Sequence, residues 1–209
     1  MSVPAVTVLG VIGLELRELA LPGLTEPLTV TVELDEVVAV VLSEPVATAL
    51  ADVVTGIAEP DGGEVRVDGA PVAVPRAGVP SRVALVPSDG GLLPHLTVRA
   101  NILYGRCVGE GLRVEQLRGQ LRSAATQLSL LDVLDAYPYE LTAGRRLRVG
   151  LARALLRAPV AVVLEDRSDR PSWAAQLHRR DPLDGTAVLV LADRRDRVAG
   201  IADSVVEAG

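Results

Sequence analysis

The chain has 209 residues, 49% of them hydrophobic and 2% aromatic, and its formal net charge is −6. This length fits one domain of ordinary size, and the hydrophobic content excludes an intrinsically disordered chain. The acidic balance argues against a general nucleic-acid binder, because such proteins neutralise phosphates with basic residues.

Two features of the composition restrict the chemistry and the compartment. All 21 basic residues are Arg, so any mechanism that needs a lysine is excluded. The single cysteine, Cys107, excludes an internal disulfide and fits a reducing compartment. No apolar run approaches the roughly 18–20 residues of a membrane span, and no basic residue of a secretory signal precedes Arg17. We therefore expect a cytoplasmic protein.

The first part of the chain is predicted to be largely β-structure. Apolar runs and alternating patterns bounded by turn residues predict strands at Leu28–Leu34, Val37–Leu42, Glu64–Val74 and Arg82–Val86. The third of these segments reads as a hairpin that turns at Asp68 and Gly69. Between the second and third of these segments, good helix formers predict a helix over Pro45–Ile57.

The rest of the chain alternates helices with buried strands. Helical spacing of apolar residues predicts helices at Thr97–Tyr104, Leu112–Leu131, Leu141–Leu155 and Asp193–Ala202. Continuous apolar runs predict strands at Val160–Leu164 and Thr186–Leu191, followed by a stub at Val205 and Val206. Because strands and helices alternate and the strands are continuously apolar, the order predicts an α/β fold with a mainly parallel sheet.

Three stretches in this order resemble the ATP-binding cassette of ABC transporters: Thr55–Gly69, Leu92–Val98 with Asn101 behind it, and Tyr137–Pro159. The last stretch holds a Tyr-Pro pair, a segment at the place of the family signature LSGGQ, and an Arg-rich helix that ends at a proline. The resemblance implies a P-loop NTPase-like cassette with a parallel core sheet, an N-terminal antiparallel β part and an inserted helical subdomain. We expect a single domain over residues 1–209, with the helical subdomain at about residues 97–141.

The phosphate-binding loop departs from the family pattern G-x-x-x-x-G-K-[ST], in which N–H groups wrap the phosphates and the lysine neutralises their charge. Counting back from Gly56, the lysine position falls at Ala47, although counting forward from the strand shifts this register by one residue. The segment Val41–Thr48 contains no glycine, and Glu44 adds a negative charge there. Thr48 alone matches, as the hydroxyl that would hold Mg²⁺. The sequence favours an ordinary helical surface hydroxyl instead.

Other active-site positions depart as well. Ser88 stands where the family has a glutamine that contacts Mg²⁺ and the attacking water, and Ala192 stands where it has the switch histidine. His95 and His178 lie elsewhere and are expected to be solvated or capping side chains. No aromatic residue precedes Tyr104, so the residue on which the family stacks adenine is missing.

The acidic pair after the strand Val160–Leu164 is retained in reversed order. Glu165 falls at the position of the Mg²⁺-coordinating aspartate, and Asp166 falls at that of the water-polarising glutamate. An aspartate would sit back from the water by about one methylene, which general-base catalysis tolerates poorly. These two are the remaining catalytic candidates, and solvated carboxylates at a strand end are the alternative. Arg167, where the family has a proline, can pair with either carboxylate.

The signature is the motif that persists. In the family two cassettes pack head to tail, and the signature of one presses on the γ-phosphate held by the P-loop of the other. Thr142, Ala143 and Gly144 keep the hydroxyl, the small residue and the glycine at a helix N-terminus, where N–H groups favour an anion. The resemblance implies nucleotide binding in trans through these three residues. An N-cap explains Thr142 equally well.

The sequence therefore favours a catalytically degenerate ABC transporter subunit that does not hydrolyse ATP by itself and binds no cofactor tightly alone. The resemblance implies an intact cassette or a second copy as partner, with Mg-ATP at their interface. It also implies the coupling helix of a membrane permease, favoured by the retained Leu92–Val98, and a place at the inner face of the membrane. The alternatives are an active ATPase with an aberrant P-loop, and a soluble regulatory or scaffold protein that kept the fold. No nucleic-acid partner is expected.

Overall fold

The computed structural model describes residues 10–72, 82–177 and 181–208. Within these ranges the strands are β1 (Ile12–Ala20), β2 (Leu28–Glu33), β3 (Val37–Val41), β4 (Gly62–Val67), β5 (Ala70–Pro71), β6 (Val83–Val86), β7 (Ala161–Asp166), β8 (Ala187–Ala192) and β9 (Ser204–Glu207). The α-helices are α1 (Glu44–Val54), α2 (Val98–Tyr104), α3 (Val114–Gln127), α4 (Ala143–Leu155) and α5 (Trp173–Gln176). A π-helical turn, η1 (Gly105–Gly109), follows α2, and 3₁₀ turns are η2 (Leu131–Val133), η3 (Pro138–Glu140), η4 (Asp181–Leu183) and η5 (Arg195–Val198).

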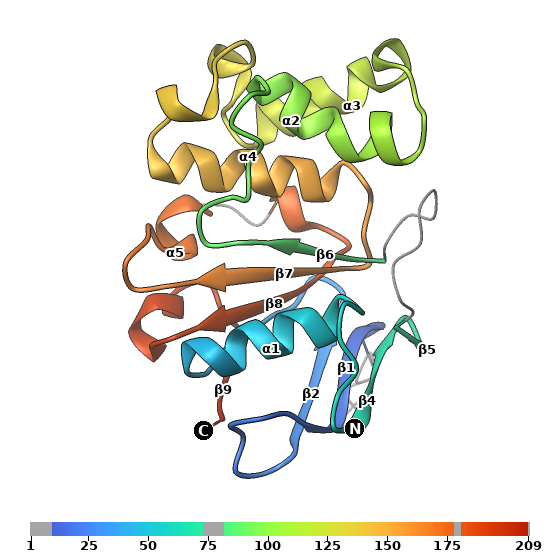
Figure 1. Cartoon of the computed structure of the whole chain (residues 1–209), viewed down its shortest axis with the longest axis vertical. Coiled ribbons are helices and arrows are strands. Elements are labelled where there is room, and N and C mark those ends of the chain that lie inside the picture. The colour runs from blue at the N-terminus through green and yellow to red at the C-terminus, as the bar shows by residue number, and fades with distance from the viewer. Residues whose placement is uncertain (1–9, 73–81, 178–180, 209) are drawn as a thin grey trace, which may run out of the picture.

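These strands form two sheets. The parallel sheet has the order β6-β7-β8-β3-β9, and the antiparallel sheet has the order β2-β1-β4-β5. Figure 1 shows α2, α3 and α4 on one side of the parallel sheet, with α1 and the antiparallel sheet on the other. The predicted α/β cassette, with its parallel core, antiparallel β part and helical insertion, is confirmed. The single-domain boundary and the limits of the helical subdomain stay predictions.

The parallel sheet is buried on both faces, and this explains the continuous apolar runs of its strands. Val38 and Val40 of β3 face the core shared with α1 and the antiparallel sheet. Val37 and Ala39 face the core beneath α2, α3 and α4. β7 alternates in the same way and lies in the same sheet as β3, with β8 between them.

The antiparallel sheet contains the predicted hairpin and one strand that the sequence did not single out. The hairpin β4–β5 turns at Asp68 and Gly69, which both adopt positive φ, of 48° and 72°. The predicted end of this hairpin, residues 73–74, lies outside the described residues. The unassigned strand, β1, pairs with β2 on one side and β4 on the other. A β-bulge interrupts its alternation, and Glu18 has φ 47° there.

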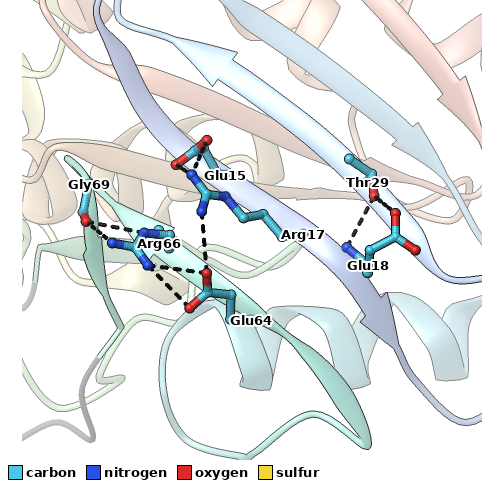
Figure 2. Close-up of polar contacts among 7 residues, drawn as sticks. All are labelled: Glu15, Arg17, Glu18, Thr29, Glu64, Arg66 and Gly69. Carbon is cyan, nitrogen blue, oxygen red and sulfur yellow. Dashed lines mark hydrogen bonds and ion pairs between the residues drawn. The ribbon is translucent and has the colours of Figure 1, made fainter.

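Alternating charges cross the exposed face of this sheet (Figure 2). Arg17 of β1 stands opposite Glu64 of β4, and Glu15 stands opposite Arg66. The guanidinium of Arg17 contacts Glu15 at 2.9 Å and Glu64 at 3.4 Å, and Arg66 contacts Glu64 at 3.1 Å. Opposite charges directly across two strands contribute about 0.2–1 kcal/mol each. The network therefore stabilises the pairing of β1 with β4 and neutralises the two arginines and two glutamates that form it.

In the helical layer, two polar residues hold the turn that precedes α2. Thr97 caps α2 as predicted, because its hydroxyl accepts a hydrogen bond from the Ala100 N–H at 3.3 Å. The fully buried Asn101 amide accepts from the Leu93 N–H at 2.8 Å and donates to the Leu93 and Leu96 carbonyl oxygens. Across the described ranges, no helix combines the length and the apolar character that crossing a bilayer requires.

Several predicted element limits are corrected. The helix predicted at Leu112–Leu131 is the shorter α3, because Ser129 adopts a left-handed φ of 54° just beyond it. The helix predicted over Asp193–Ala202 is wrong. Only the 3₁₀ turn η5 forms there, between the extended Arg194 and Gly200, whose φ is 89°. The stub predicted at its end is the full strand β9, which pairs with β3.

Gly150→Ala is expected to lower the free energy of unfolding by about 1–3 kcal/mol, the usual cost of overpacking. A Cβ at this position of α4 would lie 2.6 Å from the Gly90 carbonyl oxygen, a backbone atom that cannot rotate away. The control is Gly119→Ala in α3, where nothing lies within 4 Å and helix propensity should add about 1 kcal/mol. Denaturant titration measures both, and equal effects would contradict the close approach.

Candidate functional site

The segment that corresponds to the phosphate-binding loop is largely helical. Leu42 and Ser43 alone connect β3 to α1. Glu44 and the residues after it therefore form helical turns instead of the open turn whose N–H groups wrap phosphates. The Thr48 hydroxyl donates to the Glu44 carbonyl oxygen at 3.1 Å, and the Ala47 side chain is buried.

A cavity of about 200 Å³ lies beside the start of α1, at the carboxyl ends of β7 and β8. One basic residue, Arg167, lines it. The acidic residues that line it are Glu44, Glu165, Asp166, Asp169 and Asp193. Phosphate groups carry negative charge, so this excess of carboxylates disfavours a triphosphate at the cavity. A larger cavity, of about 680 Å³, includes Val160 and Thr186 at the opposite ends of these strands, away from the motif positions.

The resemblance implies Mg²⁺ beside Thr48 and Glu165, yet one oxygen of each residue is already engaged. Thr48 Oγ1 accepts from Arg167 Nη2 at 3.2 Å besides donating to the helix. Glu165 Oε2 accepts from the Ser88 N–H at 3.3 Å and lies 3.8 Å from Arg167 Nε. In the described part of the chain, no three His, Cys, Asp or Glu side chains are grouped so that they could hold a metal. Mg²⁺ at this place would have to displace the Arg167 guanidinium from both oxygens.

Asp166, at the position of the catalytic glutamate, has a completely buried side chain. Its Oδ2 accepts from the Trp173 N–H at 2.7 Å, and its Oδ1 pairs with the Arg197 guanidinium. Burial raises the pKa of Asp166 above its ordinary value, against the Trp173 N–H and Arg197, which favour the ionised form. Both oxygens have partners within the protein, so the carboxylate is placed as a structural anchor between β7, α5 and η5.

Asp193 follows Ala192, the residue at the switch-histidine position, and joins β8 to the loop after β7. Its Oδ2 accepts hydrogen bonds from the N–H of Ser168, at 2.8 Å, and from the hydroxyl of the same residue. Burial acts to raise the pKa of Asp193, but the Ser168 bonds and the Arg197 charge outweigh it, and the pKa is lowered. His95 is exposed, as expected, and His178 lies outside the described residues.

The signature residues begin α4 and do not line the cavity. Thr142 is exposed and caps the helix, its side chain accepting from the Arg145 N–H at 3.4 Å. Ala143 and Gly144 are partly exposed. A Cβ on Gly144 would meet the Gln176 side-chain amide at 2.4 Å, the far end of a flexible side chain. The N-cap interpretation of Thr142 is thus present in the structure, and binding in trans stays a prediction.

Residues 28–167, more than half of the chain, match the family model described as ABC transporter. The chain belongs to this family. It is 33% identical over 124 residues to the sulfate/thiosulfate import ATP-binding protein CysA of Synechococcus elongatus, a match that covers 55% of this chain and 35% of that protein. It is 33% identical over 132 residues to the molybdenum import ATP-binding protein ModC of Pseudomonas savastanoi pv. phaseolicola, covering 58% and 35%. The matches therefore span about a third of the length of these relatives.

Solved ABC cassettes share the fold over nearly the whole chain. CbiO1 of Clostridium perfringens, part of the ABC transporter complex CbiONQ, aligns with a TM-score of 0.73 at 17% identity, covering 94% of this chain and 84% of CbiO1. An ATP-binding cassette of an ABC transporter in its ADP conformation aligns with a TM-score of 0.75 at 18% identity, covering 95% and 89%. At these identities the likeness shows the ABC cassette fold alone.

Three residues of this cassette that the sequence did not single out complete the polar contacts at the strand ends. They are Trp173 and Arg197, which hold the candidate acid Asp166, and Ser168, which bonds Asp193. Trp173 also donates from its indole Nε1 to the Glu165 carbonyl oxygen at 2.9 Å. For Trp173 the sequence offered one indication of a structural role. It is the single tryptophan of an aromatic-poor chain, and tryptophan side chains are usually largely buried.

Proposed function

We propose that the chain is a catalytically degenerate ATP-binding-type subunit of an ABC transporter. It leaves its own nucleotide site unused and caps ATP held by an intact partner cassette. The observation that carries the proposal is the cavity beside α1, where carboxylates and one guanidinium stand in place of a glycine-rich loop. The same observation disfavours an active ATPase with an aberrant P-loop.

The expected loss of affinity is large. Hydrogen bonds to charged groups contribute about 1.5–3 kcal/mol each. Without two or three of those that a P-loop makes, binding weakens by about 4 kcal/mol or more, enough to turn a micromolar site into a millimolar one. The carboxylates of Glu44 and Glu165 add repulsion at the same place. Binding at this site would then be about a thousandfold weaker than at an intact P-loop.

The proposed partners follow from the family and the relatives. CysA and ModC are named import ATP-binding proteins, so we place this chain with an import permease at the cytoplasmic face of the membrane. The turn Leu92–Val98, held by the buried Asn101, is the proposed contact for the coupling helix of that permease. An intact cassette, or a second copy of this chain, would pack against the start of α4.

Calorimetry of the purified chain with Mg-ATP tests the first part of the proposal. We expect no binding in the low micromolar range. Ala47→Lys should not restore binding, because the surrounding segment still lacks glycine and forms helix. An intact cassette, titrated under the same conditions, is the positive control. A low micromolar dissociation constant for the unmodified chain would contradict the proposal.

A further inference from the structure

Arg167 connects elements that are far apart in the sequence. It follows β7, and its side chain is only 20% exposed. One terminal nitrogen pairs with the Glu44 carboxylate in the first turn of α1, and the other donates to Thr48 Oγ1 at 3.2 Å. Its Nε lies 3.8 Å from Glu165 Oε2 on β7 itself. One planar guanidinium thus contacts three side chains on two elements.

The Arg167 contacts are more than a surface ion pair. Glu165 has a side chain that is only 13% exposed, so its charge is poorly solvated and depends on Arg167 and the Ser88 N–H. Glu44 is 74% exposed and could be solvated without Arg167. The planar guanidinium donates one hydrogen bond, to Thr48, and meets the two carboxylates as ion pairs.

The position of this guanidinium matches the place where a nucleotide would be held. Arg167, Glu44 and Glu165 all line the cavity beside α1. An incoming phosphate would have to take Arg167 away from both carboxylates and would then lie beside them uncompensated. Two further bonds hold the neighbouring segments: Ser168 to Asp193, and Asp166 to Arg197. The strand ends and α1 are therefore cross-linked by the chain's own side chains.

We propose that Arg167 closes this cavity from within and holds α1 and the end of β7 in one arrangement that needs no nucleotide. The Arg167 guanidinium, at the end of β7, supplies the positive charge that a P-loop lysine would provide from the start of α1. This inference concerns the same cavity as the proposed function, but its failure and that of the proposed function are measured separately. Tight ATP binding by the chain would contradict the proposed function. Unchanged amide exchange in α1 after replacement of Arg167 would contradict the closure.

Amide hydrogen exchange of the full chain tests the closure. Arg167→Ala is expected to accelerate exchange about tenfold at residues 46–48 and at residues 168–170 together, because one side chain restrains both segments. The control, Arg99→Ala, makes the same change of charge and breaks an exposed ion pair with Asp135 at 2.9 Å. It should leave both segments unchanged. Unchanged exchange at residues 46–48 in Arg167→Ala would overturn the proposal.

Glu44→Gln keeps the test decisive if Arg167→Ala unfolds the chain generally. Glu44 is mostly exposed, so this variant should fold while removing the ion pair to α1 and keeping the bond to Thr48. Exchange at residues 46–48 and 168–170 should then rise several-fold, and exchange elsewhere should stay as it was. A Glu44→Gln chain that exchanges like the wild type in both segments would contradict an ion-pair cross-link between Arg167 and α1.

Discussion

A transporter complex in which this chain carries Gly144→Asp is expected to lose about 100-fold or more of its ATP hydrolysis, if the chain caps a partner's γ-phosphate. A new carboxylate at the start of α4 would lie against that phosphate, and two like charges about 4 Å apart repel by several kcal/mol near a protein surface. The added negative charge would offset the attraction that the N–H groups at the start of α4 exert on an anion. Steady-state ATPase of the complex, assembled with its intact partner cassette, measures the effect.

Two features of the structure make the Gly144→Asp result interpretable. The three atoms nearest to the new Cβ all belong to the Gln176 side-chain amide, which can rotate away, so the variant should fold as the wild type does. Gly119→Asp is the matched control, because nothing lies within 4 Å of that position in α3 and the change of charge is the same. Thermal unfolding of both variants checks the fold. Full activity of the Gly144→Asp complex would show that Thr142 is only a helix cap and that the subunit is structural.

Asp166→Ala is expected to lower the free energy of unfolding by about 3–5 kcal/mol, the usual cost of removing one member of a buried ion pair. The Asp166 side chain is fully buried, and its loss would leave the Arg197 guanidinium and the Trp173 N–H without their partner. Chemical denaturation of the purified chain measures the loss. A change below about 1 kcal/mol, the range of an exposed ion pair, would show that this pair is not buried in solution.

The double variant Asp166→Asn with Arg197→Met separates the ion pair from the hydrogen bond. Asparagine can still accept from the Trp173 N–H, and methionine removes the charge that would otherwise stay unpaired. The double variant should therefore lose less stability than the sum of the two single variants, because the penalty of a lone buried charge is absent. Additive losses would contradict a direct coupling between the two side chains.

The local sequence was sufficient for most of the fold. The apolar run Val37–Leu42 predicted a strand buried on both faces, and β3 is such a strand. The hairpin turn at Asp68 and Gly69 was equally readable, because few residues other than glycine and aspartate tolerate positive φ. The helix predicted over Asp193–Ala202 failed, because its apolar spacing did not outweigh the left-handed Gly200.

Motif spacing in the sequence also determined the family and the absence of a glycine-rich phosphate loop. Only the tertiary structure decided which distant residues Arg167 and Arg197 meet. The sheet order β7-β8-β3 is not the chain order, and it brings the start of α1 beside Arg167, although Thr48 is 119 residues away. The residues Asp166 and Arg197 meet for the same reason. The chain has 21 arginines and 27 acidic residues, so the sequence alone does not show which acidic residue a given long arginine side chain will reach. The packing of the strands selects the partner.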